Sequence, residues 1–141
     1  MSFILVGVDG SENSIQALRW AGEQAVLRDA PMRAVYVWEF PYMDIVPPTL
    51  GATLPPYSEM QDAAERALDA AITSAALPPA CKVDRVVEEG AVVKILLDAA
   101  KDADMLVVGA RGHGGFLGLV TGSVTTQLVH HATVPTVVVR A

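Results

Sequence analysis

The residues best suited to chemistry are three glycines and a serine with the spacing Gly109-x2-Gly112-x9-Gly122-Ser123. They follow a short apolar run, 105–108, and precede an apolar pattern of helical period. Glycine lets a backbone approach a bulky anion and permits positive φ angles, and a helix N-terminus offers unpaired N–H groups and a partial positive charge. We therefore predict that this segment binds phosphate groups.

The spacing differs from that of the P-loop, and the chain contains no Gly-Lys pair, so the lysine of Walker-type sites is absent. A tight strand-to-helix turn also favours glycine, and turn chemistry alone is the structural alternative. Ser123 is likewise a preferred helix-capping residue, although one hydroxyl can serve both a helix and a ligand. The residues assigned to the phosphates are Gly109, Gly112, Gly122, Ser123, Val124 and Thr125, and Val108 is assigned to the nucleotide site beside them.

Two ionisable side chains, Arg111 and His113, lie inside the glycine segment. Either could screen phosphate charge, and His113 could accept a proton; a solvent-facing position is the alternative for both. Fast phosphoryl transfer usually needs lysine, arginine and Mg²⁺ placed against the transition state, together with a positioned base. The segment has no lysine and no obvious pair of carboxylates, which favours a protein that holds a nucleotide over one that turns it over.

The composition excludes other classes of function. The net charge is −6 with only three lysines, which argues against binding to nucleic acid. No apolar run approaches the ~20 residues of a membrane span, and no secretion signal is recognisable. The single Cys81 suits a reducing cytosol and reads as a small half-buried apolar residue. His130-His131 lacks a third ligand, so no zinc site is expected, whereas Mg²⁺ or Mn²⁺ could be carried by a triphosphate.

Strands and helices alternate along the whole chain, which predicts an α/β fold with a parallel sheet and helices on both faces, in one domain spanning residues 1–141. Ser58-x-x-Gln61 has the spacing of a capping box, so a helix should begin at Ser58. Residues 41–56 carry five prolines and resist regular structure. The expected strands cover 3–8, 32–38, 81–88, 105–108 and 136–139, and the expected helices follow 9–11, begin at 58, run through 92–100 and extend from about 123 to 131.

A family resemblance rests on three of these segments. Residues 107–115, with Thr121-Gly-Ser-Val-Thr125, resemble the nucleotide-binding signature of universal stress proteins, and the glycine spacing is similar to that of the ATP-binding members. Residues 4–12 resemble the opening strand and turn of that family, and residues 134–139 its last strand. The resemblance implies an open doubly wound sheet of five strands in the order 3-2-1-4-5, with ATP as the ligand.

In that order the sheet reverses between the first and fourth strands, where ligands of open α/β sheets bind. Asp9 follows the first strand, and its carboxylate suits the hydroxyl pair of a ribose; a turn or capping aspartate is the alternative. The resemblance implies that Asp9 holds ribose and that Val37 flanks adenine. Gly7 and Val8 would form the floor of the crevice.

The resemblance also implies a nucleotide-dependent stress-response protein, and the single cysteine with no recognisable secretion signal predicts a cytoplasmic one. Two alternatives stay open: a slow ATPase or phosphoryl or nucleotidyl transferase, and a sensor of AMP or cyclic AMP. The segment Thr136-Val137-Val138-Val139 is a short, uncharged apolar strand near the chain end, and such an edge associates unless it is covered. Members of the family pair this strand with a second copy, so a two-fold homodimer is expected. The sequence does not indicate a protein partner of another kind.

Overall fold

The computed structural model describes residues 2–40, 55–111 and 123–141. Each predicted strand is present, with ends that differ by at most two residues from those expected. The order is β1 (Ile4–Val8), α1 (Glu12–Leu27), β2 (Met32–Trp38), α2 (Tyr57–Ala75), β3 (Val83–Glu89), α3 (Val92–Ala100), β4 (Met105–Gly109), α4 (Ser123–His131) and β5 (Thr136–Val139).

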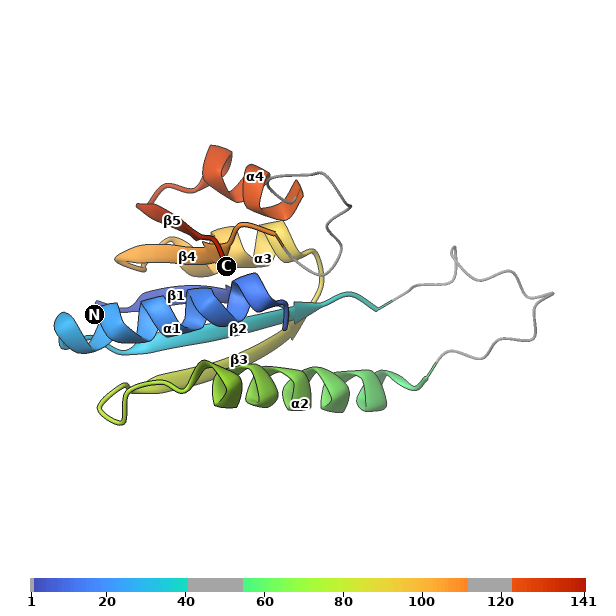
Figure 1. Cartoon of the computed structure of the whole chain (residues 1–141). Coiled ribbons are helices and arrows are strands. Elements are labelled where there is room, and N and C mark those ends of the chain that lie inside the picture. The colour runs from blue at the N-terminus through green and yellow to red at the C-terminus, as the bar shows by residue number, and fades with distance from the viewer. Residues whose placement is uncertain (1, 41–54, 112–122) are drawn as a thin grey trace.

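The five strands form one parallel sheet in the order β3-β2-β1-β4-β5 (Figure 1). Helices α1 and α2 pack on one face, where they share a buried cluster with Ile4 and Val6. Helices α3 and α4 pack on the other face, with Leu5 and Leu106. The predicted fold class, an open doubly wound sheet of order 3-2-1-4-5 with helices on both faces, is confirmed.

The sequence of β1 is apolar at successive positions because both of its faces are covered. Ile4, Leu5 and Val6 are fully buried, and β4 is buried along its whole length. Continuous apolar runs of this kind are typical of central parallel strands. The edge strands β3 and β5 are only half-buried. The central strands β1 and β4 are therefore the most deeply buried of the five strands.

The predicted capping box at the start of α2 is wrong. The helix begins at Tyr57 after Pro56, whose φ of −57° already suits a helix, and no side chain caps its first turn. The Gln61 side chain instead accepts a hydrogen bond of 2.7 Å from Trp38 Nε1 at the end of β2. The Trp38 and Tyr57 rings also meet, with centroids 4.9 Å apart. A strand–helix contact thus replaced the local cap.

Cys81 has the structural role expected of it. It is partly buried against the cluster on the α1–α2 face, and a Cβ built on Gly22 of α1 would lie 3.7 Å from its sulfur. Burial raises the pKa of the Cys81 thiol, which lowers its reactivity because the thiolate is the reactive form. No helix among the described residues has the length and apolar character needed to cross a membrane.

Candidate functional site

The sheet divides at the carboxyl ends of its two central strands. β1 and β4 are paired only as far as Val6 and Val107. Beyond that point β1 stays paired with β2 through Val8, whereas β4 stays paired with β5 through Gly109. The strand order reverses at this split, and open α/β sheets bind ligands at such a reversal. We call this place, between Val8 and Gly109 at the carboxyl ends of β1 and β4, the split.

On the β1 side of the split, Asp9 forms the turn that leads into α1. Its Oδ1 accepts a hydrogen bond of 2.9 Å from Ser11 N, and Gly10 takes a φ of +84° that favours glycine. Asp9 N also donates to Ser14 Oγ at 3.4 Å. The turn role that was left open for Asp9 is therefore present. A role toward ribose would be additional to it.

The N-cap of α1 connects the two sides of the split. Ser11 Oγ accepts from Ser14 N at 3.2 Å, which satisfies one of the unpaired donors of the first turn. The same hydroxyl donates to the Arg111 carbonyl at 3.3 Å. The turn after β1 and the chain leaving β4 are thus joined, although they lie 100 residues apart. Turn and cap chemistry was expected of residues 9–11, and Ser11 is the N-cap. Its bond to Arg111 was not predicted, because a partner 100 residues away leaves no local signal.

Gly109 has a packing reason to be glycine. A Cβ at this position would lie 2.7 Å from the Asn13 carbonyl carbon and 2.9 Å from Ser14 N, both in the first turn of α1. The helix therefore needs a strand residue without a side chain, whether or not a ligand binds. The phosphate role predicted for Gly109 is therefore not needed to explain the glycine. Because α1 fills that face, a ligand would have to reach Gly109 from another side.

Thr125 lies on α4 and is 5% exposed. Its Oγ1 donates a hydrogen bond of 2.8 Å to the Gly109 carbonyl, which ties α4 to the end of β4. A threonine hydroxyl has one proton to donate, so Thr125 does not donate to a phosphate while this bond is made. Ser123, in contrast, is exposed at the first position of α4.

The remaining predicted site residues fall into three groups. Val8 and Val108 are buried beside the split, and Gly7 faces α3, where a Cβ would lie 3.1 Å from Leu96 Cδ1. Val37 of β2 and Val124 of α4 both pack against the cluster on the α3–α4 face, so Val37 sits one strand away from the split. Three predicted residues lie outside the described part of the chain: Gly112, His113 and Gly122.

Tyr36 is a neighbour of the site that the sequence analysis missed. It stands opposite Val8 in the β1–β2 ladder and is half-buried on the α1–α2 face. Burial, and to a lesser extent the Asp9 carboxylate, raises the pKa of Tyr36. The phenol therefore lies within the electrostatic field of Asp9. The signal was its register with β1, which a sequence alone does not supply.

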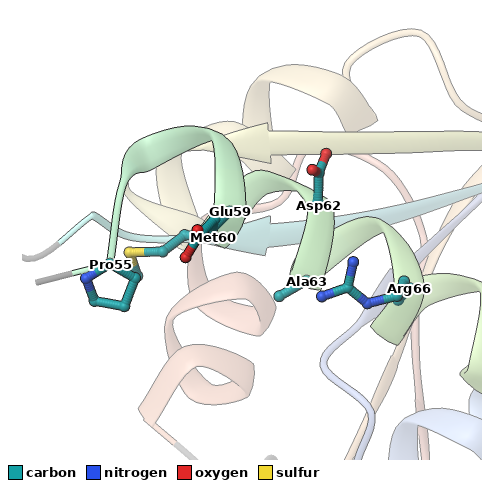
Figure 2. Close-up of a pocket in the computed structure, with 6 residues that line it drawn as sticks. All are labelled: Pro55, Glu59, Met60, Asp62, Ala63 and Arg66. Carbon is teal, nitrogen blue, oxygen red and sulfur yellow. The ribbon is translucent and has the colours of Figure 1, made fainter.

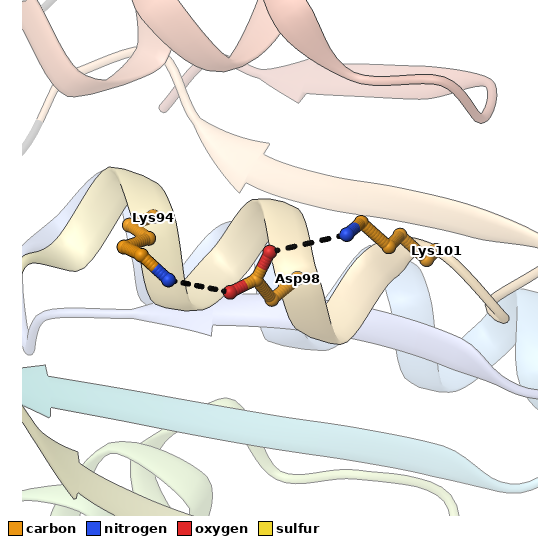
Figure 3. A network of polar contacts seen from close by, with 3 residues as sticks. All are labelled: Lys94, Asp98 and Lys101. Carbon is orange, nitrogen blue, oxygen red and sulfur yellow. Dashed lines mark hydrogen bonds and ion pairs between the residues drawn. The ribbon is translucent and has the colours of Figure 1, made fainter.

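None of the three lysines, all within the described part of the chain, serves the split. Lys94 and Lys101 bind the Asp98 carboxylate at 3.1 and 3.4 Å on the exposed side of α3 (Figure 3). Their hydrogen bonds lower the pKa of Asp98. Lys82 directly precedes β3, at the opposite end of the sheet from the split. Positive charge for an anion at the split would therefore not come from a lysine.

A shallow pocket lies elsewhere, over the first turns of α2. None of the residues predicted for the functional site lines it, and we assign it no function. Among the residues that the structure describes, no three His, Cys, Asp or Glu side chains are grouped so that they could hold a metal ion. The pocket is lined by Pro55, Glu59, Met60, Asp62, Ala63 and Arg66 (Figure 2).

Comparison with known proteins adds a family model and several relatives. The model of the universal stress protein family matches residues 1–140. A universal stress protein of Mycolicibacterium smegmatis is 35% identical over 146 residues, covering 97% of this chain and 47% of that protein. One from Mycobacterium tuberculosis is 34% identical over 145 residues, with the same coverages. The chain thus spans about half the length of these curated relatives.

Solved structures share the fold. The universal stress protein UspA from Lactobacillus plantarum is 27% identical with a TM-score of 0.79, over 99% of this chain and 97% of that one. A universal stress protein in complex with cAMP is 23% identical with a TM-score of 0.65, covering 98% and 95%. One from Archaeoglobus fulgidus in complex with dAMP is 22% identical with a TM-score of 0.66, covering 99% and 98%.

Proposed function

The chain belongs to the universal stress protein family, and from this membership we propose that it is a nucleotide-dependent regulatory protein that binds ATP at the split. The observation that carries the proposal is the divergence of β1 and β4 after Val6 and Val107, directly before the glycine segment that leads to α4. Relatives of the same fold have been solved with adenine nucleotides, which supports the ligand class.

Each group at the split would have a distinct task. The Asp9 carboxylate would accept from the ribose hydroxyls, with Val37 beside the adenine and Gly7 and Val8 beneath it. The phosphates would be bound by amides between Gly109 and Val124, by the Ser123 hydroxyl and by the charge of Arg111. A hydrogen bond to a charged group is worth about 1.5–3 kcal/mol, so two or three of them supply a large part of a micromolar affinity.

A metal ion would come with the nucleotide. Magnesium at phosphate sites takes one or two carboxylates and several oxygens from phosphate and water, and no cluster of metal-ligating side chains occurs in the described ranges. We therefore expect Mg²⁺ or Mn²⁺ to be carried by the triphosphate. Because the lysines serve other parts of the molecule, we favour a protein that holds ATP over a slow ATPase or a transferase.

A second candidate ligand is an adenosine monophosphate, since relatives have been solved with cAMP and with dAMP. Calorimetric titration of the purified chain with ATP, AMP and cAMP tests both candidates. We expect ATP to bind in the micromolar range, near −8 kcal/mol, and more tightly than cAMP. Clearly tighter binding of cAMP would mean that cAMP, and not ATP, is the ligand. If none of the three nucleotides gives a heat of binding, the proposal of a nucleotide site is contradicted.

We propose a homodimer formed along β5. Its sequence Thr136–Val139 carries no charge, and Val138 is 36% exposed. The other sheet edge, β3, exposes Asp84, Arg85 and Glu88. Charged side chains on an edge strand discourage pairing with another chain, whereas an uncharged apolar edge invites it. The contrast between the two edges supports β5 as the edge that a second copy covers.

Val138→Lys should convert the dimer to a monomer, because a charged side chain on an edge strand discourages its pairing with another chain. Light scattering coupled to size exclusion would then give the chain mass of 14.9 kDa, against twice that mass for the wild type. Val26→Lys is the matched control, because Val26 of α1 is 37% exposed, close to the 36% of Val138. This variant should leave the dimer intact. A dimeric Val138→Lys variant would contradict the β5 interface.

A further inference from the structure

The peptide group between Gly109 and Ala110 is held on both sides. The Gly109 carbonyl accepts from Thr125 Oγ1 at 2.8 Å. The Ala110 N–H donates to the Val139 carbonyl at 2.8 Å. A peptide unit is planar, so fixing both its oxygen and its hydrogen fixes its orientation. The last peptide of β4 is thereby locked between α4 and β5.

A second hydroxyl holds the next part of the chain from the opposite side. Ser11 Oγ donates to the Arg111 carbonyl at 3.3 Å and at the same time caps α1. Gly109 itself lies against the first turn of α1. Two hydrogen bonds therefore hold the chain at the end of β4, one from Ser11 at the start of α1 and one from Thr125 of α4. We call this pair of hydrogen bonds the clamp. Both protons go to main-chain carbonyls, so neither hydroxyl donates to a ligand in this arrangement.

We propose that Thr125 and Ser11 are positioning residues, which set the distance from the β4 exit to the start of α4 and to the turn at Asp9. This inference rests on the proposed nucleotide site, whose phosphate and ribose contacts come from these three places. Donors aimed at an anion act most strongly when they are already in place before it binds. A displaced α4 would move the donors at Ser123 and Val124 relative to those of β4.

Thr125→Val tests the Thr125 side of the clamp. A methyl group in place of the hydroxyl converts a 2.8 Å hydrogen bond into a carbon–oxygen contact of about 3.3–3.6 Å. The first turn of α4 should move away from β4 by several tenths of an ångström. We expect ATP affinity to fall about tenfold, the equivalent of one charged hydrogen bond, with adenosine affinity unchanged within about twofold. Thr125→Ser keeps the hydroxyl and should bind ATP like the wild type.

The comparison of ATP with adenosine separates positioning from a general structural role. Loss of stability alone would leave both affinities intact in the folded protein, and a distorted crevice would weaken both ligands equally. Amide hydrogen exchange in the ligand-free protein gives an independent readout. The Ala110 amide should exchange about tenfold faster in Thr125→Val than in the wild type or Thr125→Ser, because its peptide group loses one of its two hydrogen bonds.

Ser11→Gly tests the other side of the clamp. Glycine is tolerated at an N-cap with only a small loss of helix stability, so this variant removes the bond to Arg111 and largely spares α1. We expect a loss of ATP affinity of several fold, again without loss of adenosine binding. Ser11→Thr, which keeps the donor, should restore it.

Two results would overturn the inference. One is unchanged ATP affinity in both Thr125→Val and Ser11→Gly; the other is an equal loss for ATP and adenosine. If the wild-type protein binds no adenine nucleotide, the proposed function fails and the inference falls with it. If the wild type binds ATP and the variants bind it equally well, only the inference fails.

Discussion

Gly109→Ala should destabilise the folded protein by about 3 kcal/mol, because overpacking against atoms that cannot move is costly. The added Cβ would lie 2.7 Å from the Asn13 carbonyl carbon and 2.9 Å from Ser14 N. Both are backbone atoms of α1, so relief requires moving the helix away from the sheet. Chemical denaturation monitored by circular dichroism measures the free energy of unfolding of the variant.

Gly7→Ala is the matched control on the neighbouring strand. Its Cβ would meet the side-chain ends Leu96 Cδ1 at 3.1 Å and Val108 Cγ1 at 3.3 Å. Terminal methyl groups can shift by a few tenths of an ångström, so this variant should cost less than about 1 kcal/mol. Equal stability of the two variants would mean that α1 does not press on Gly109 as described.

A substitution at Gly109 changes the packing of α1 as well as any phosphate contact. A Gly109 variant that fails to bind ATP would report a displaced α1 as readily as a lost phosphate contact. Substitutions that leave the fold in place are the informative ones. Thr125→Val keeps the size of the side chain, and we expect only a small shift of the first turn of α4, whereas Gly109→Ala has to displace α1.

Asp9→Asn should lower ATP affinity by about 1.5–3 kcal/mol, the worth of hydrogen bonds to a charged group. Asparagine keeps an Oδ1 that can accept from Ser11 N, as Asp9 does at 2.9 Å. It loses the charge and the second carboxylate oxygen that a ribose diol would use. Stability should therefore change by no more than about 0.5 kcal/mol. Calorimetry gives the affinity, and chemical denaturation gives the stability.

Asp9→Ala completes the comparison, since it removes the turn acceptor as well. We expect the same loss of affinity together with about 1 kcal/mol of lost stability, typical of a deleted capping or turn hydrogen bond. If Asp9→Asn binds ATP as tightly as the wild type, then Asp9 serves the turn alone.

Tyr36 provides an internal check on the Asp9 variants. Its pKa is raised first by burial and second by the Asp9 carboxylate. Removing the negative charge in Asp9→Asn should lower the pKa of Tyr36, while burial keeps it above its ordinary value. Ultraviolet titration of the phenolate, with Tyr36→Phe to assign the signal, would detect the change. An unaltered titration would mean that Asp9 and Tyr36 are not coupled.

Local patterns were enough to predict the elements. The apolar runs that became β1 and β4 are continuous because helices cover both faces of a central parallel strand. The alternation of strands and helices predicted a parallel sheet, and the position of Asp9 after β1 allowed either a turn role or a ribose-binding role. The strand order came from the family resemblance, because the pattern does not specify which strands are neighbours.

The contacts that the sequence did not predict concern residues whose partners are distant in the chain. Gln61 matched a capping box, yet its side chain binds Trp38, 23 residues earlier. Thr125 was assigned to phosphate, and its proton goes to the Gly109 carbonyl, 16 residues earlier. In each case the side chain makes its hydrogen bond to a group that folding brings close.

The positions of the strands and helices follow from local sequence, since they depend on apolar periodicity and on the backbone preferences of neighbouring residues. The need for glycine at position 109, and the carbonyl partners of the Ser11 and Thr125 hydroxyls, became visible only in the folded chain. The physical reason is that packing and hydrogen bonding act over a few ångströms in space, whatever the separation along the chain. Two residues 100 positions apart become neighbours only once the sheet has assembled.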